Sequence, residues 1–347
     1  MQRHREDNLH NDRQALLSSI DQSMLLLTTP AATIASSIGA WAQSQREGWL
    51  AELYGEDITE DVRQLKPESA QSQLVSVLED LLSRTCTVTQ AVERTQQLVL
   101  SEPGKLFANL TGIYFSAVKF FADEGTTRVL VDYIVALAKL PDAVNEGPEP
   151  MVIDLGGDRT YSIQPGEVID PGDGKLWRTL PGFSMYISEE SQGTSLISLE
   201  TFISLYADSL RAGAEAYLCH LSRLATPAEA RDRWRNFNAW LVEAAASQEA
   251  QGIPVLAGLK RLGPRALAMA LEHSPGTRLG RNTGMHLPAA TLWMRKAEDE
   301  VKAVCVAGTQ RFMAGDLWYS VCSEDDPTLC TKARLEFWRS RLVELGC

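Results

Sequence analysis

Few residues of this sequence have the types and spacing that chemistry requires, and the first group lies in the glycine-rich segment 274–288. This segment holds Arg281, His286 and three glycines but no acidic residue, although the whole chain carries a net charge of −12. We expect a loop here, longer than the ~2–8 residues of most helix connections, and such loops often carry binding residues. Arg281 and His286 could then bind the carboxylate or enolate of a metabolite. The alternative, a surface loop whose cations pair with neighbouring acids, agrees better with the residues alone.

A second group lies on the segment 226–246, TPAEARDRWRNFNAWLVEAAA, whose pattern predicts an amphipathic helix. Its apolar stripe comprises Trp234, Phe237, Leu241 and Ala245, widened by Trp240 and Ala244. Asn238 projects from the same stripe, and a buried amide without a hydrogen-bond partner costs about 1–3 kcal/mol. Asn238 must therefore anchor another part of the chain or contact a ligand. The residue types favour an anchor for Asn238 and core packing for Trp240, but both stay candidate ligand-binding residues.

No catalytic motif is complete. Residues 280–284 read Gly-Arg-Asn-Thr-Gly, without the Lys-Ser/Thr ending of a phosphate-binding loop, and the glycines at 156–157 lack the third glycine of a dinucleotide fingerprint. No two histidines have metal-ligand spacing, and the six cysteines include no Cys-x-x-Cys pair. We therefore expect no cofactor and no metal. The sequence identifies no catalytic residue and leaves open whether the protein is an enzyme.

Charge and hydropathy limit the environment and the partners. The net charge of −12 and the scattered basic residues argue against binding to nucleic acid or to an anionic membrane. Residues 1–12 are polar and charged, unlike a secretory signal, and no apolar run reaches the ~18 residues that a membrane span needs. These features predict a cytoplasmic protein whose six cysteines are reduced. They leave the oligomeric state open.

Helical periodicity dominates the elements that must position these residues. It predicts an all-α protein, a bundle-like body of about eleven helices. The expected regions are a disordered tail (1–8), an N-terminal helical region (9–141), a proline- and glycine-rich connector (142–197), and a C-terminal helical region (198–347) that packs with the first as one body. Residues 142–183 hold five prolines and seven glycines, so they cannot form one long helix. Within them, segments 151–155 and 160–163 are expected to pair as a short β-hairpin.

Five segments together carry a resemblance. In chain order they are YIVALAKLPDA (133–143), KLWRTLPGFSM (175–185), WRNFNAW (234–240), AATLWMRKAEDEV (289–301) and RLEFWRSRLVEL (334–345). The order and spacing of their tryptophans and Leu-Pro pairs resemble those of a large fungal family of uncharacterised proteins, known as a domain of unknown function. The resemblance spans roughly residues 106–347 and implies a mainly helical, cytosolic protein. Some members of that family are encoded among natural-product biosynthesis genes, but the resemblance brings no catalytic residues with it.

Two functions of different classes remain. One is the cofactor-independent binding or transformation of a small apolar intermediate of fungal secondary metabolism, in a cavity between helices. The other is a non-catalytic helical protein that acts in protein–protein interaction or as an accessory factor. A closed apolar pocket with a few convergent polar groups would favour the first function, and a broad exposed apolar patch would favour the second. Because some members of that family are encoded among natural-product biosynthesis genes, the first function, metabolite binding or transformation, is slightly favoured.

Overall fold

The computed structural model describes residues 37–47, 65–154, 160–170, 174–191 and 227–347. Residues 37–47 are helical, and the other described residues form fourteen α-helices, one 3₁₀ helix and a two-stranded sheet. The predicted all-α class with a small hairpin is therefore confirmed. The predicted tail 1–8 and the start of the C-terminal helical region, from residue 198 to residue 226, lie outside the described residues, and the division into regions stays a prediction. No helix among the described residues is long and apolar enough to cross a membrane.

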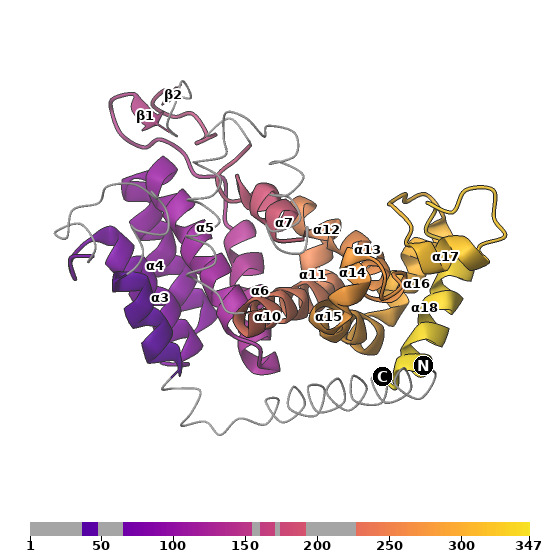
Figure 1. Ribbon diagram of the computed structural model, residues 1–347. Helices are drawn as coiled ribbons and strands as arrows, with labels where there is room; N and C mark the ends of the chain where they lie inside the picture. The colour runs from indigo at the N-terminus through magenta and orange to yellow at the C-terminus, as the bar shows by residue number, and fades with distance from the viewer. Residues whose placement is uncertain (1–36, 48–64, 155–159, 171–173, 192–226) are drawn as a thin grey trace, which may run out of the picture.

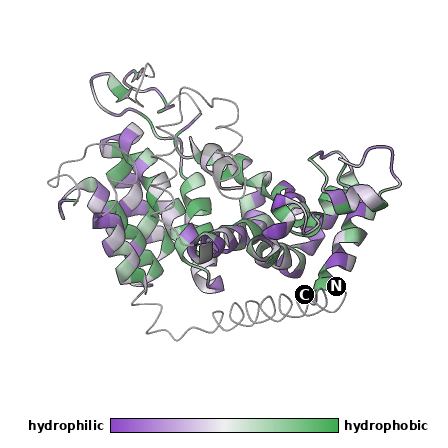
Figure 2. Ribbon diagram, viewed as in Figure 1, coloured by the Kyte–Doolittle hydropathy of each residue, from purple (hydrophilic) through white to green (hydrophobic). Residues whose placement is uncertain are grey.

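The first helices lie together at one end of the molecule, coloured indigo to magenta in Figure 1. They are α3 (Ala70–Leu82), α4 (Val88–Ser101), α5 (Pro103–Phe120) and α6 (Glu124–Ala138). Side-chain caps begin three of them, because Ser69, Thr87 and Asp123 accept hydrogen bonds from the backbone N–H groups three residues later. In Figure 2 hydrophobic and hydrophilic residues alternate along the turns, as expected of helices with one buried face.

The connector follows as the predicted hairpin and one helix. Strand β1 (Met151–Asp154) pairs antiparallel with β2 (Thr160–Ile163), and α7 (Phe183–Ser191) comes next among the described elements. The buried amide of Asn145 holds this segment in shape, since its Nδ2 donates to the carbonyls of Glu149 and Ile163, each at 2.9 Å. The hairpin expected from the turn residues is thus confirmed.

Helix α10 (Pro227–Ala246) lies at the centre of the molecule, between the first helices and the rest (Figure 1). Every residue of its predicted stripe is buried. The indole of Trp240 donates from Nε1 to the hydroxyl of Tyr114 on α5 at 2.7 Å, and Asn236 donates from Nδ2 to the carbonyl of Lys119 at 2.9 Å. The tyrosine hydroxyl in turn donates to the carbonyl of Leu130 on α6 at 2.9 Å. The apolar stripe therefore packs on two helices of the first group, as its pattern requires.

The remaining elements follow α10 and end at the opposite side of the molecule. They are α11 (Gln248–Gln251), α12 (Pro254–Ala257), the 3₁₀ helix η3 (Leu259–Arg261), α13 (Leu262–Leu271), α14 (Arg278–Arg281), α15 (Thr283–Lys296), α16 (Glu298–Ala307), α17 (Asp316–Val321) and α18 (Lys332–Leu345). Helix α15 packs against both α10 and α13. The motif segment 289–301 is not one helix, because the backbone leaves the helical region at Ala297 (φ −139°, ψ 34°) and separates α15 from α16.

The prediction of a loop over residues 274–288 is wrong. Most of it is helical, as α14 and the first two turns of α15. Its glycines suggested flexibility, but Gly280 serves close packing: a Cβ there would lie 1.8 Å from the carbonyl oxygen of Ser274. Helix α15 also contains Pro288, and buried residues around it, including Leu287, hold that helix against its neighbours. In this segment, burial of side chains in the core outweighs the glycines and the proline, which by themselves disfavour a helix.

A fully buried ion pair joins the end of α13 to α18. The guanidinium of Arg334 donates from Nε to Oε1 of Glu272 at 2.6 Å and from Nη2 to Oε2 at 2.8 Å, and both side chains are 0% exposed. The same carboxylate accepts from Trp338 Nε1 at 2.7 Å and from the backbone N of Gly315 at 2.9 Å. The remaining guanidinium nitrogen, Nη1, donates to carbonyls of residues 327–329. Because each nitrogen and oxygen of the pair has a partner, the pair can exist without water.

Candidate functional site

The interface between α10 and α15 contains two of the four predicted site residues, Asn238 and His286. The amide of Asn238 is 0% exposed and uses both ends within the protein. Its Nδ2 donates to the carbonyl of Trp234 at 2.9 Å, and its Oδ1 accepts from Nε1 of Trp293 on α15 at 3.0 Å. Asn238 therefore forms an interhelical anchor, the interpretation that its residue type favoured over a ligand contact.

His286 lies inside the protein and not on a surface loop. Its side chain is 2% exposed and its ring meets that of Trp234 edge to face, with centroids 5.8 Å apart. Burial, with a smaller contribution from the charge of His273, lowers the pKa of His286 to about 4. The imidazole is therefore neutral at pH 7 and adds no positive charge to this segment. His286 Nδ1 and Trp234 Nε1 are both buried without a hydrogen-bond partner.

The other two predicted residues lie apart from this interface. Arg281 is exposed on α14 and donates from Nη1 to the carbonyl of Gly276 at 3.2 Å. Trp240 is buried against α5, where its indole bonds to Tyr114. None of the four predicted residues lines either of the two hollows that are described below. The structure thus brings together Asn238 and His286 at one helix interface, but it does not unite the four in one binding site.

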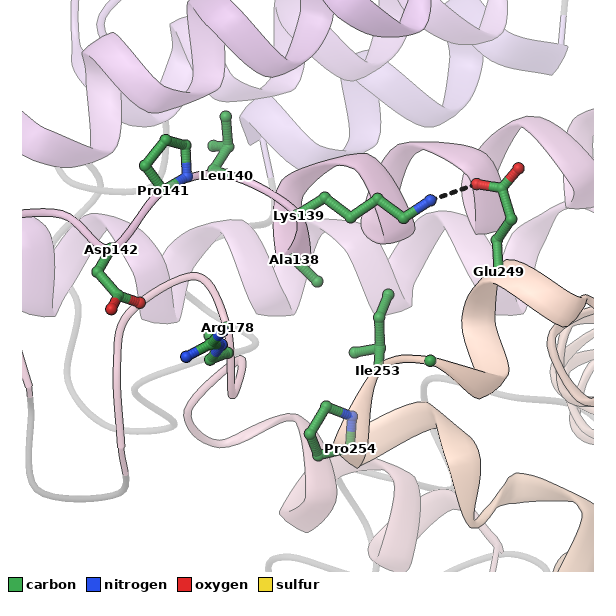
Figure 3. A pocket seen from close by; sticks show the side chains of 10 residues that line it. Ala138, Lys139, Leu140, Pro141, Asp142, Arg178, Glu249, Ile253 and Pro254 are labelled. Carbon is green, nitrogen blue, oxygen red and sulfur yellow. Dashed lines mark hydrogen bonds and ion pairs between the residues drawn. The ribbon is translucent and has the colours of Figure 1, made fainter.

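The larger hollow is an open cleft of about 490 Å³ that lies where the end of α6 faces α11 and α12 (Figure 3). We call it the α6–α12 cleft. It is lined by Ala138, Lys139, Leu140, Pro141, Asp142, Arg178, Glu249, Gly252, Ile253 and Pro254. A smaller hollow of about 390 Å³ lies between α3 and α4, lined by Gln73, Ser76, Val77, Arg94, Gln97, Leu98 and Ser101. The α6–α12 cleft is the better candidate because it combines prolines and aliphatic side chains with several charges.

Of the four charged residues that line the α6–α12 cleft, three form ion pairs with other described residues and one does not. Lys139 and Glu249 form an ion pair across it, drawn as a dashed line in Figure 3, and this bond lowers the pKa of Glu249. Asp142 pairs with Lys175, which lies just outside the lining. Arg178 is exposed and forms no ion pair with any residue that the structure describes. The cleft therefore presents one guanidinium whose charge no described carboxylate compensates.

This arrangement suits binding of an anion. A guanidinium offers five N–H donors in a fork that matches a carboxylate. Next to it, Leu140, Ile253 and Pro254 supply apolar surface. No histidine, cysteine, serine or threonine is among the described residues lining the cleft, and its lysine and two carboxylates are held in the ion pairs Lys139–Glu249 and Asp142–Lys175, so the lining offers an ordinary anion contact.

Sequence reasoning missed this site, although a signal for it was present. The cleft is bordered by two of the motif segments, 133–143 and 175–185, each of which contains a Leu-Pro pair. The first segment supplies Leu140 and Pro141, and the second supplies Arg178. Because residues 144–174, which include the hairpin, separate these two segments in the sequence, their approach could not be inferred from either motif alone.

The geometry defines a mainly helical protein with an open, mixed-polarity cleft. A family model described as "Protein of unknown function (DUF3632)" matches residues 56–342. The chain belongs to this family, which confirms the expected membership of an uncharacterised domain-of-unknown-function family. No curated protein and no solved structure matches the chain.

Proposed function

We propose that this protein binds a small amphipathic metabolite that carries a carboxylate, in the α6–α12 cleft. The observation that carries the proposal is the exposed guanidinium of Arg178, which has no ion-pair partner among the described residues and lies beside apolar wall residues. A carboxylate would take the place of the absent acidic partner. The apolar part of the ligand would lie along Ile253 and Pro254, between Arg178 and the Lys139–Glu249 pair.

Size and charge support this assignment. A volume of about 490 Å³ lies within the range of small-molecule sites, ~300–1,000 Å³. Lys139 and Glu249 neutralise each other, and Asp142 is neutralised by Lys175. The unbalanced charge of the cleft is thus that of Arg178, which favours a ligand with one negative charge. An open cleft leaves part of the ligand in water, so we expect a dissociation constant in the micromolar range or weaker.

The metabolite class rests on the resemblance. Membership of a fungal family with relatives encoded among natural-product biosynthesis genes would make the ligand an intermediate of secondary metabolism, bound in the cytoplasm without a cofactor. Many such intermediates combine an apolar skeleton with an acid group, which is the chemistry that the α6–α12 cleft would recognise. The binding proposal itself needs only the geometry of the cleft.

Isothermal titration calorimetry with octanoate and with octanol tests the proposal. We expect octanoate to bind and octanol to bind at least tenfold more weakly, because a hydrogen bond to a charged group contributes about 1.5–3 kcal/mol. Arg178→Ala should weaken octanoate binding by a similar factor. Arg265→Ala, which removes another exposed arginine outside the cleft, is the matched control and should leave binding within twofold. Octanoate binding that Arg178→Ala leaves unchanged would exclude this cleft as the site.

A further inference from the structure

Two cysteines that are distant in the sequence meet inside the C-terminal part of the protein. Cys305 lies on α16, and Cys330 directly precedes Thr331, the N-cap residue of α18. Their Sγ atoms are 3.1 Å apart, and the two residues are 2% and 0% exposed. Both are free thiols in this structure. A disulfide bond needs about 2.05 Å between the sulfurs, so a displacement of about 1 Å would close it.

The backbone on both sides of the sulfur pair is held in place. Cys305 is part of a regular helix, and the backbone N of Cys330 donates to the carbonyl of Gln310 at 2.9 Å. The neighbouring carbonyl of Leu329 accepts from Nη1 of Arg334 at 3.3 Å, which connects this segment to the buried ion pair. Two thiols whose backbones are fixed in this way lose little further freedom when they become linked.

The two thiols differ in reactivity. The hydrogen bond between the two sulfurs, and then the charges of Arg334 and Arg339, lower the pKa of Cys305. The same hydrogen bond, together with burial, raises the pKa of Cys330. Because the thiolate is the nucleophile in thiol oxidation, Cys305 is the sulfur that reacts first and Cys330 the sulfur that resolves the product.

We propose that Cys305 and Cys330 form a reversible disulfide that fastens α16 to the start of α18 when hydrogen peroxide is present. The Cys305 thiolate attacks one peroxide oxygen; an S–O bond forms, the O–O bond breaks, and the hydroxide that leaves takes up a proton. The Cys330 sulfur then loses its proton and attacks the Cys305 sulfenic acid; the S–S bond forms, the S–O bond breaks, and the second oxygen leaves as water. Two thiols and one peroxide thus give one disulfide and two waters.

The linkage would change the stability of the C-terminal part. It closes a loop over a sequence separation of 25 residues, which includes Gly315, whose backbone N donates to the buried carboxylate of Glu272, and all of α17. A cross-link of this length limits the unfolded chain, and we expect the melting temperature of the oxidised protein to rise by about 5 °C.

Thiol counting on the full-length chain tests the proposal. The reduced protein is treated with hydrogen peroxide, unfolded, and alkylated with N-ethylmaleimide. We expect intact mass to show four alkylated cysteines out of six, and peptide mapping to join Cys305 to Cys330. Dithiothreitol should restore six alkylated cysteines and remove the gain in melting temperature.

Variants separate this pair from the other cysteines. Cys322→Ser, which removes a half-buried cysteine in the same part of the chain, should leave the disulfide and the melting shift intact. Cys305→Ser should abolish both, and the mapping of the wild-type protein keeps the test decisive if that variant does not fold. Six alkylated cysteines after peroxide treatment and also after refolding in a glutathione redox buffer, or a mapped bond between other cysteines, would overturn the proposal.

Discussion

Replacing His286 by leucine is expected to remove much of the loss of stability that the protein suffers in mild acid. The folded protein lowers the pKa of His286 from 6.5 to about 4, because the imidazole is buried and His273 lies close enough to repel its charge. Below pH 6.5 the unfolded chain therefore takes up a proton on this residue that the folded chain does not. Stability must fall as the pH falls from 6.5 towards 4, and it is unaffected by this group above pH 7.

The magnitude follows from the two pKa values. The complete effect is about 3 kcal/mol, of which ~2 kcal/mol should be lost between pH 7 and pH 5. Urea denaturation at pH 7, 6 and 5 measures it as the change in the free energy of unfolding. We expect His286→Leu to lose ~2 kcal/mol less than the wild-type protein over this interval. Carboxylates contribute equally to both proteins and titrate mainly below pH 5.

His273→Leu is the control for the histidine prediction. His273 is half-buried near Asp316 and its pKa is lowered in the same direction, first by burial, so its replacement should reduce the acid effect less. If His286→Leu and the wild-type protein lose the same free energy between pH 7 and pH 5, His286 is not held neutral by burial. The α10–α15 interface would then be more open to water than the structure shows.

The other predictions concern the buried polar groups. Trp293→Phe and Trp234→Phe remove the same buried ring volume, but Trp293→Phe should cost about 1–3 kcal/mol more, because it leaves Oδ1 of Asn238 unpaired whereas Nε1 of Trp234 has no partner to lose; equal losses in urea denaturation would contradict this. Trp234→Ala, by contrast, should cost ~3–5 kcal/mol because it empties a large buried volume, and an unchanged melting curve would refute that packing. Glu272→Leu should cost about 3–5 kcal/mol, since it leaves the charge of Arg334 buried, and the double change with Arg334→Met should recover most of the loss; a double variant as unstable as the single one would refute this.

Local sequence patterns predicted the elements that are stabilised by contacts within a short stretch of the chain. The stripe of α10 is a repeat of apolar side chains at helical spacing, and a helix with such a stripe must bury it. The hairpin of β1 and β2 depends on two short segments and the turn between them, which are neighbours in the sequence. In both cases the interactions that stabilise the element join residues a few positions apart, so no knowledge of the remaining chain was needed.

The candidate site could be predicted only in part. Asn238 was expected to be buried and hydrogen-bonded, and the structure supplies the partner, Trp293, 55 residues away. His286 and Arg281 were expected on one loop, but the structure buries the first and exposes the second. Glycines in 274–288 indicated a loop because the sequence does not reveal whether a glycine provides flexibility or allows close approach.

The sequence by itself determined the helical class, the acidic charge, the central helix and the hairpin, because composition and short periodic patterns contain that information. Tertiary structure alone decided three features that join distant residues. The carboxylate of Glu272 meets Arg334 across 62 positions, Cys305 meets Cys330 across 25, and the α6–α12 cleft unites residues from Ala138 to Pro254. The physical reason is the same for each feature. The function of a charge, a thiol or a cleft wall depends on the residues that pack against it, and the packing of the whole core determines which residues those are.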